Sequence, residues 1–89
     1  MNNLLALPEG ARALYVLAHG AGAGMRHPFL EAVALALASH GIGTFRYEFH
    51  YMEKRSKRPD SPAVAVARVR EAVEEAARVA PGVPLIAGG

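Results

Sequence analysis

Residues 15–29 read YVLAHGAGAGMRHPF, and this stretch decides how the rest of the chain can be arranged. An apolar run over residues 13–18 leads directly into glycines at every second position, Gly20, Gly22 and Gly24. Continuous apolarity at that length is typical of a strand that is buried on both faces of a parallel sheet. The glycines mark a turn in which the backbone takes unusual dihedral angles or is approached closely by another group.

The chain after this glycine-rich turn alternates between helical and strand-like patterns. Apolar residues recur at helical spacing after Pro28, which suits the first position of a helix. The expected elements are a strand at 13–18, a helix at 28–40, a strand at 42–47, a helix at 62–80 and a strand at 83–87. The segment LLAL at residues 4–7 is a candidate for a further short strand. This order predicts an α/β fold, a partial three-layer α/β/α arrangement with a Rossmann-like parallel sheet and right-handed crossovers.

The two expected helices differ in their charge pattern. The first carries Glu31 as its only charge, so we expect it to be covered on much of its circumference. The second begins with Ser61 as its N-cap, and Glu74 and Arg78 stand four residues apart in the orientation that favours an ion pair. Its expected apolar stripe is Val66, Val69, Val73 and Ala76 or Ala77, with Arg68, Arg70, Glu71 and Glu75 among the residues of the other faces.

The composition of the 89 residues fits one globular domain or part of one. Apolar residues make up 52%, which argues against disorder, and the lack of cysteine excludes a disulfide framework and a thiolate metal site. The net charge of +2 is small, and the basic residues of 54–58 are interpreted as a solvated loop rather than a nucleic-acid surface. No apolar run reaches the roughly 18 residues of a membrane span, and the N-terminus lacks a signal-peptide pattern, so a cytoplasmic protein is expected.

Three chemical roles compete for HGAGAG at residues 19–24. A phosphate loop of nucleoside triphosphatases requires a lysine and a hydroxyl residue after its last glycine, where this chain has Met25 and Arg26. A dinucleotide fingerprint that starts at Gly20 needs its last glycine at position 25, where this chain has Met25. In its favour, Glu48 stands where an acidic contact to the ribose is expected. An oxyanion loop requires backbone N–H groups that face a developing negative oxygen, which glycines permit. A tight turn from strand to helix with no catalytic role is the remaining alternative.

The motifs LAHGAGAGMRHPF, GIGTFRYEFHYMEKRSKRPD and PLIAGG together resemble the N-terminal part of an α/β-hydrolase. They are most similar to the dienelactone-hydrolase-like branch, which includes the testis-expressed hydrolase-like proteins. In α/β-hydrolases one oxyanion donor comes from the loop that follows such a strand and often begins with His-Gly. The resemblance also implies that strand 13–18 lies between strands 42–47 and 83–87, with the glycine-rich corner at a topological switch point.

The resemblance further implies a nucleophile elbow, G-x-S-x-G, after the last strand, with Gly89 as its first glycine. The serine, acid and histidine of the triad would then follow the 89 residues, which we expect to be inactive by themselves. Three parallel strands and two helices also make a thin core. Residues 1–89 are therefore interpreted as the front part of a single α/β-hydrolase domain.

By carry-over from the family, the oxyanion N–H is expected from Ala21 or Gly22. His19 is interpreted as the structural histidine of the His-Gly pair rather than a general base. His27 is expected to cap the helix that follows or to line the pocket, and residues 46–51 are expected near the mouth of the active site. The expected binding residues are His19, Gly20, Gly24, Arg26, His27, Tyr47 and His50.

The function that the resemblance implies is that of a serine hydrolase, acting on an ester, thioester or related acyl bond of a small molecule. No cofactor or metal is expected, since four histidines without cysteines or clustered carboxylates do not form a metal site. No nucleic-acid or membrane partner is expected, while oligomerisation through an exposed sheet edge stays open. Two alternatives remain, a non-catalytic hydrolase-like scaffold or interaction module and a nucleotide-binding Rossmann-like domain.

Overall fold

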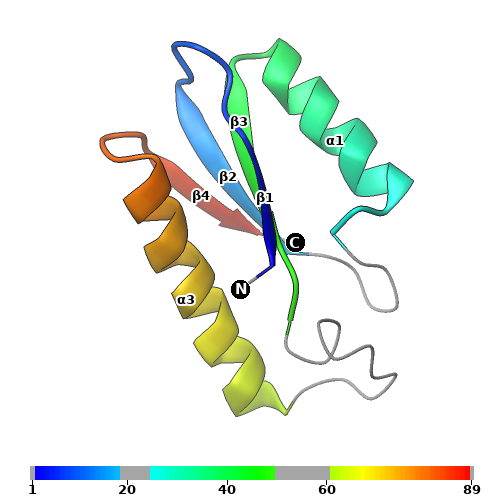
Figure 1. Ribbon diagram of the computed structural model, residues 1–89, viewed down its shortest axis with the longest axis vertical. Coiled ribbons are helices and arrows are strands. Elements are labelled where there is room, and N and C mark those ends of the chain that lie inside the picture. Colours follow the sequence, from blue (N-terminus) through cyan, green and yellow to red (C-terminus); the bar gives the residue numbers. More distant parts are fainter. Residues whose placement is uncertain (1, 19–24, 50–60, 89) are drawn as a thin grey trace.

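The computed structural model describes residues 2–18, 25–49 and 61–88 and contains four strands and two helices within them. The elements are β1 (Asn3–Ala6), β2 (Ala13–Ala18), α1 (Pro28–Ser39), β3 (Ile42–Tyr47), α3 (Pro62–Val79) and β4 (Leu85–Gly88) (Figure 1). Both predicted strands at 13–18 and 42–47 are confirmed to the residue. Each helix ends one residue earlier than predicted, and the last strand begins two residues later and ends one residue later.

The strands form one sheet in the order β1-β3-β2-β4. β2 pairs in parallel with β3 on one side and with β4 on the other, which confirms the predicted parallel sheet for these three strands. β1 is the candidate short strand of the N-terminal segment, and it runs antiparallel to β3, so the sheet is mixed. The short connection from β1 to β2 contains a turn closed by a hydrogen bond from Ala11 N to Pro8 O at 3.1 Å. This connection reverses the chain, and β1 therefore runs opposite to the parallel strands.

The chain changes direction across the sheet at β2. From β2 it passes through α1 to β3 on one side, and from β3 it passes through α3 back across β2 to β4 on the other side. The predicted position of strand 13–18 between the other two parallel strands is confirmed. Two crossovers of the same hand that run in opposite directions place their helices on opposite faces of the sheet. Figure 1 shows α1 and α3 on the two sides, and the end of β2 is thus a topological switch point.

The main core lies between the sheet and α3. Leu14 and Val16 of β2 and Phe45 and Tyr47 of β3 are almost completely buried, and they alternate along their strands as one face of a sheet requires. The helix side of this core consists of Ala72, Ala76 and Ala80. Alanine at every fourth position lets the helix backbone approach the sheet closely, because no long side chain stands between them.

The predicted apolar stripe of α3 is confirmed at Ala76, which is buried, and at Val73, which packs against the core, and it is wrong at Val66. The buried line of the helix runs through Arg68, Ala72 and Ala76, whereas Val66 is 57% exposed. Arg68, expected on a solvent face, is only 3% exposed. The line of α3 that faces the sheet thus combines two alanines with one buried arginine.

The opposite face of the sheet is covered by α1, which buries Leu30 and Ala34. The expectation that this apolar helix is covered on much of its circumference is wrong for the described residues, since Phe29 is 68% and Leu35 is 65% exposed. The helix ends one residue before the predicted position, and Gly41 takes the predicted left-handed conformation after it, with φ of 77°.

The edge strand β1 approaches β3 so closely that one position of β3 has no room for a side chain. A Cβ at Gly43 would lie 2.9 Å from the backbone oxygen of Ala6 and 2.9 Å from a methyl carbon of Leu7. Glycine at this position therefore permits the β1–β3 pairing that brings the N-terminal residues to the sheet.

The difference in burial between two leucines predicts a difference in stability. Leu14→Ala should lower the free energy of unfolding by about 2–5 kcal/mol, because Leu14 is 0% exposed and its removal leaves a cavity. Leu35→Ala, the same change at a 65% exposed position, should alter it by about 0.5 kcal/mol or less. Urea unfolding of the two variants measures both values, and equal losses would contradict the assignment of the core.

Candidate active site

The three parallel strands end at one edge of the sheet. Ala18 of β2 lies opposite Tyr47 of β3, and Leu17 of β2 lies opposite Gly88 of β4. The described chain resumes at Met25, whose backbone contacts side chains from the end of β3. Ala18 and Met25, the described residues on either side of segment 19–24, therefore both lie at the carboxyl edge of the sheet, where open α/β sheets bind their ligands.

Most of the predicted site residues lie outside the described residues. These are His19, Gly20, Ala21, Gly22, Gly24 and His50, and the basic residues of 54–58 lie outside them as well. The predicted residues that the structure describes are Arg26, His27 and Tyr47. The structure brings Arg26 and His27 together on the short turn before α1, while Tyr47 belongs to β3.

His27 is the N-cap of α1, which confirms one of the two roles expected for it. Its Nδ1 accepts a hydrogen bond from Phe29 N at 3.1 Å. Pro28 follows at the first helical position, so the helix loses no donor there. The imidazole thus satisfies one of the backbone N–H groups that a helix leaves without an internal partner at its start.

Arg26 lines an open polar pocket of about 500 Å³ at the carboxyl edge of β3. The other lining residues are Asn2, Asn3, Met25 and Glu48. Sequence reasoning missed Asn2 and Asn3, because their place in this pocket depends on the antiparallel direction of β1. It named Glu48 as a possible ribose contact and as one of the residues near the active-site mouth. In the structure the Glu48 carboxylate accepts hydrogen bonds from Met25 N at 3.4 Å and from Asn2 Nδ2 at 3.3 Å.

The buried side chain of Arg46 in β3 contacts both α1 and Met25, the first described residue after the glycine-rich segment. The Arg46 side chain is 7% exposed, and its Nη1 forms an ion pair with Glu31 Oε2 at 2.7 Å. The same Nη1 donates to Met25 O at 3.3 Å. Sequence reasoning placed Arg46 among the residues near the active-site mouth, and in the structure its charge is paired with the carboxylate of Glu31.

Comparison with known families gives a match over residues 11–89, to the family described as alpha/beta hydrolase domain. The chain belongs to the alpha/beta hydrolase domain family. This match confirms the superfamily that the sequence motifs indicated, while membership of the dienelactone-hydrolase-like branch stays a prediction. No curated protein matches the sequence.

Tyr47 is a core residue of this alpha/beta hydrolase domain. It is 2% exposed, and its ring packs edge-on against Phe49 with the ring centroids 5.7 Å apart. Burial raises the pKa of the Tyr47 phenol above its ordinary value, and the positive charge of Arg68 lowers that pKa in part. The part of Tyr47 in substrate binding stays a prediction, and the described contacts give it a packing role beneath α3.

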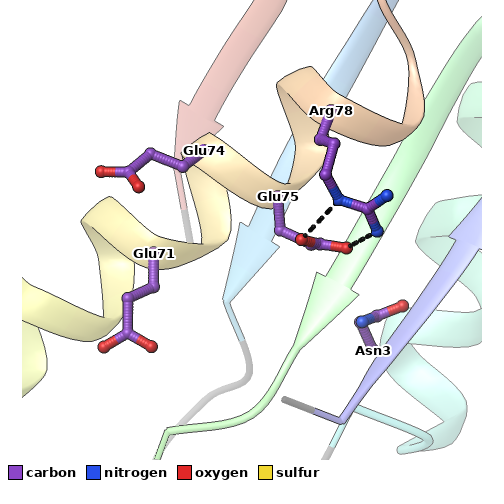
Figure 2. Close-up of a pocket in the computed structure, with 5 residues that line it drawn as sticks. All are labelled: Asn3, Glu71, Glu74, Glu75 and Arg78. Carbon is purple, nitrogen blue, oxygen red and sulfur yellow. Dashed lines mark hydrogen bonds and ion pairs between the residues drawn. The ribbon is translucent and has the colours of Figure 1, made fainter.

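A second pocket of the alpha/beta hydrolase domain lies between α3 and β1, with a volume of about 550 Å³ (Figure 2). Figure 2 shows two hydrogen bonds from the Arg78 guanidinium to the Glu75 carboxylate, while the carboxylates of Glu71 and Glu74 point away from Arg78. The predicted Glu74–Arg78 pair is therefore replaced by a pair three residues apart. The hydrogen bond from Arg78 lowers the pKa of Glu75. These residues form a solvated acidic face of α3.

Within the ranges that the structure describes, no group of three or more histidine, cysteine or acidic side chains is placed to hold a metal ion. In the same ranges no helix combines the length and the apolar character that crossing a bilayer requires.

The raised pKa of Tyr47 predicts how the stability of the fold depends on pH. The unfolded phenol loses its proton near pH 10, whereas the buried phenol retains it to higher pH. The stabilisation is complete below the unfolded pKa and is lost as the pH rises through the folded pKa. The free energy of unfolding should therefore fall as the pH rises above about 10, and Tyr47→Phe should reduce this fall. Urea unfolding at a series of pH values measures it, and an identical fall in the variant would contradict the prediction.

Proposed function

We propose that this chain supplies the oxyanion loop of a serine hydrolase that cleaves ester, thioester or related acyl bonds of small molecules. The family establishes a hydrolase-like scaffold, and the glycine-rich segment 19–24 is its chemically distinctive part. In the proposed site, the backbone N–H of Ala21 or Gly22 donates a hydrogen bond to the developing negative oxygen.

The pairing of β2 with β4 is the observation that carries this proposal. In α/β-hydrolases one oxyanion donor follows the strand equivalent to β2, and the other is the residue after the nucleophile, which follows the strand equivalent to β4. β2 and β4 are neighbours here, with Leu17 opposite Gly88. Neighbouring strands lie about 4.8 Å apart, so amides that follow them can both lie about 2.7–3.1 Å from one oxygen.

The proposed reaction is an acyl transfer to serine followed by hydrolysis. The serine oxygen attacks the carbonyl carbon while its proton passes to the histidine, and the carbonyl oxygen becomes an oxyanion held by the two amides. The oxyanion collapses and expels the alcohol or thiol, which takes the proton from the histidine. Water then cleaves the acyl-enzyme by the same steps. By the resemblance the serine follows Gly89, so residues 1–89 would stabilise the oxyanion and transfer no proton themselves.

Removal of a single backbone donor tests the proposed role of the segment. In the full-length protein, Ala21→Pro or Gly22→Pro should lower kcat for an aryl ester by about 10²–10³, the loss typical of a missing oxyanion donor. Ala21→Ser is the matched control, because it changes the side chain at the same position and retains the N–H. Steady-state kinetics on all three variants, with circular dichroism to verify folding, provide the measurement.

Covalent labelling tests the nucleophile independently of any chosen substrate. A fluorophosphonate should label the full-length protein on the serine of the elbow, because such probes react with activated serines. Folded proline variants that both retain turnover within about threefold of the unmodified protein would remove the oxyanion role. A full-length protein that is neither labelled nor active on esters and thioesters would remove the proposed hydrolase function altogether.

A further inference from the structure

We propose that Arg46 is a positioning residue that, together with Glu31 and Glu48, fixes the backbone of Met25 and thereby the alignment of the glycine-rich segment that Met25 ends. Its consequence for catalysis rests on the oxyanion role proposed above. Its structural part, a fixed Met25, stands on contacts among described residues. We call Arg46, Glu31 and Glu48 the Met25 clamp.

Both backbone polar groups of Met25 are held from β3 and the residues that follow it. The carbonyl oxygen accepts from Arg46 Nη1 at 3.3 Å, and the amide donates to Glu48 Oε2 at 3.4 Å. Arg46 and Glu48 are two residues apart, so in an extended chain they point to the same side of the sheet. The Met25 side chain is only 5% exposed, which fixes the residue from the other direction as well.

The ion pair between Arg46 and Glu31 is the strongest contact in the Met25 clamp. At 2.7 Å it is a short, charge-assisted hydrogen bond, whereas the two contacts to the Met25 backbone are longer and individually weaker. Glu31 lies in the first turn of α1 and thus orients the guanidinium of Arg46. Because one Nη1 group carries two protons, it can serve Glu31 and Met25 O together.

Burial of Arg46 argues for a positioning role over a purely stabilising one. The ion pair is buried on the side of Arg46 alone, since the Arg46 side chain is 7% exposed and the Glu31 side chain is 54% exposed. The guanidinium loses its hydration, and its attraction to a solvated carboxylate offsets only part of this cost. Arg46 nevertheless holds this buried position at the end of β3, where it contacts Met25, the residue that follows the glycine-rich segment. The benefit that remains is a defined geometry at Met25.

The expected consequence for catalysis follows from the small number of residues between Met25 and the proposed oxyanion donors. Ala21 and Gly22 stand four and three residues before Met25, and Ala18 in β2 precedes the segment at its other end. A misplacement of about 1 Å in a catalytic geometry can cost about 10² in rate. A loosened Met25 should therefore lower kcat more than it raises KM, since the donors act on the transition state.

Replacement of Arg46 by lysine tests the Met25 clamp, because lysine keeps the charge but cannot reproduce the planar fork of the guanidinium. In the full-length protein, Arg46→Lys should lower kcat about tenfold or more and leave KM within about twofold. Hydrogen exchange at the Met25 amide should accelerate about tenfold, while the amides of β2 keep their protection. Arg78→Lys is the matched control, since Arg78 also pairs with a glutamate but on the exposed face of α3, and it should change neither quantity.

A second variant covers the case in which Arg46→Lys does not fold. Glu48→Ala removes the acceptor of the Met25 amide without leaving a buried charge, and it should accelerate exchange at Met25 in the same way. Unchanged Met25 exchange in a folded variant would overturn the inference. Uniformly faster exchange throughout the sheet, with turnover per folded molecule unchanged, would also overturn it, since this is the result of a purely stabilising residue.

The two readouts separate this inference from the proposed function. Exchange at Met25 depends on the clamp and not on activity. If the full-length protein hydrolyses no acyl substrate, the proposed function fails, and the exchange measurement alone decides whether Arg46 fixes Met25. If the protein is active and Arg46→Lys leaves kcat unchanged despite faster exchange at Met25, the positioning role is wrong and the hydrolase function stands.

Discussion

The whole arrangement depends on β2 being paired along both of its edges and packed beneath α3. Its backbone bonds β3 on one side and β4 on the other, and Leu14, Val16 and Leu17 are all buried. A strand in this position can neither shift its register nor expose an edge without breaking two ladders. The corner that follows Ala18 is therefore attached to the most constrained strand of the sheet.

β3 links this rigid centre to the candidate site because its neighbouring residues serve opposite faces. Phe45 and Tyr47 pack beneath α3, while Arg46 between them reaches α1 and Met25. β3 therefore positions residues of the main core on one face of the sheet and Arg46 of the Met25 clamp on the other. Precise placement of catalytic amides requires such a supporting layer, since donors on a loop are only as well placed as the residues that hold the loop.

The sequence predicted those features of the fold that depend on residues close to one another in the chain. The apolar run of 13–18, the caps at Ser61 and Gly41 and the alternation of elements each rest on residues close in sequence, and each is present in the structure. The oxyanion residues Ala21 and Gly22 lie outside the described residues and stay a prediction. The polar pocket was missed because Asn2 and Glu48 are 46 positions apart and meet only through the β1–β3 pairing.

The sequence by itself determined the kinds of elements, their order, the glycine-rich corner and the family, because periodicity, caps and motifs are written in consecutive residues. Only the tertiary structure decided the direction of β1, the face of α3 that meets the sheet, the choice of Glu75 over Glu74 by Arg78, and the contact of Arg46 with Glu31 and Met25. The direction of β1, the rotation of α3 and the contacts of Arg46 depend on how closely separate elements pack, which no pattern along the chain encodes. The Glu75–Arg78 pair lies within α3, where glutamates three and four residues away are both within reach of Arg78, so the sequence alone leaves the choice open.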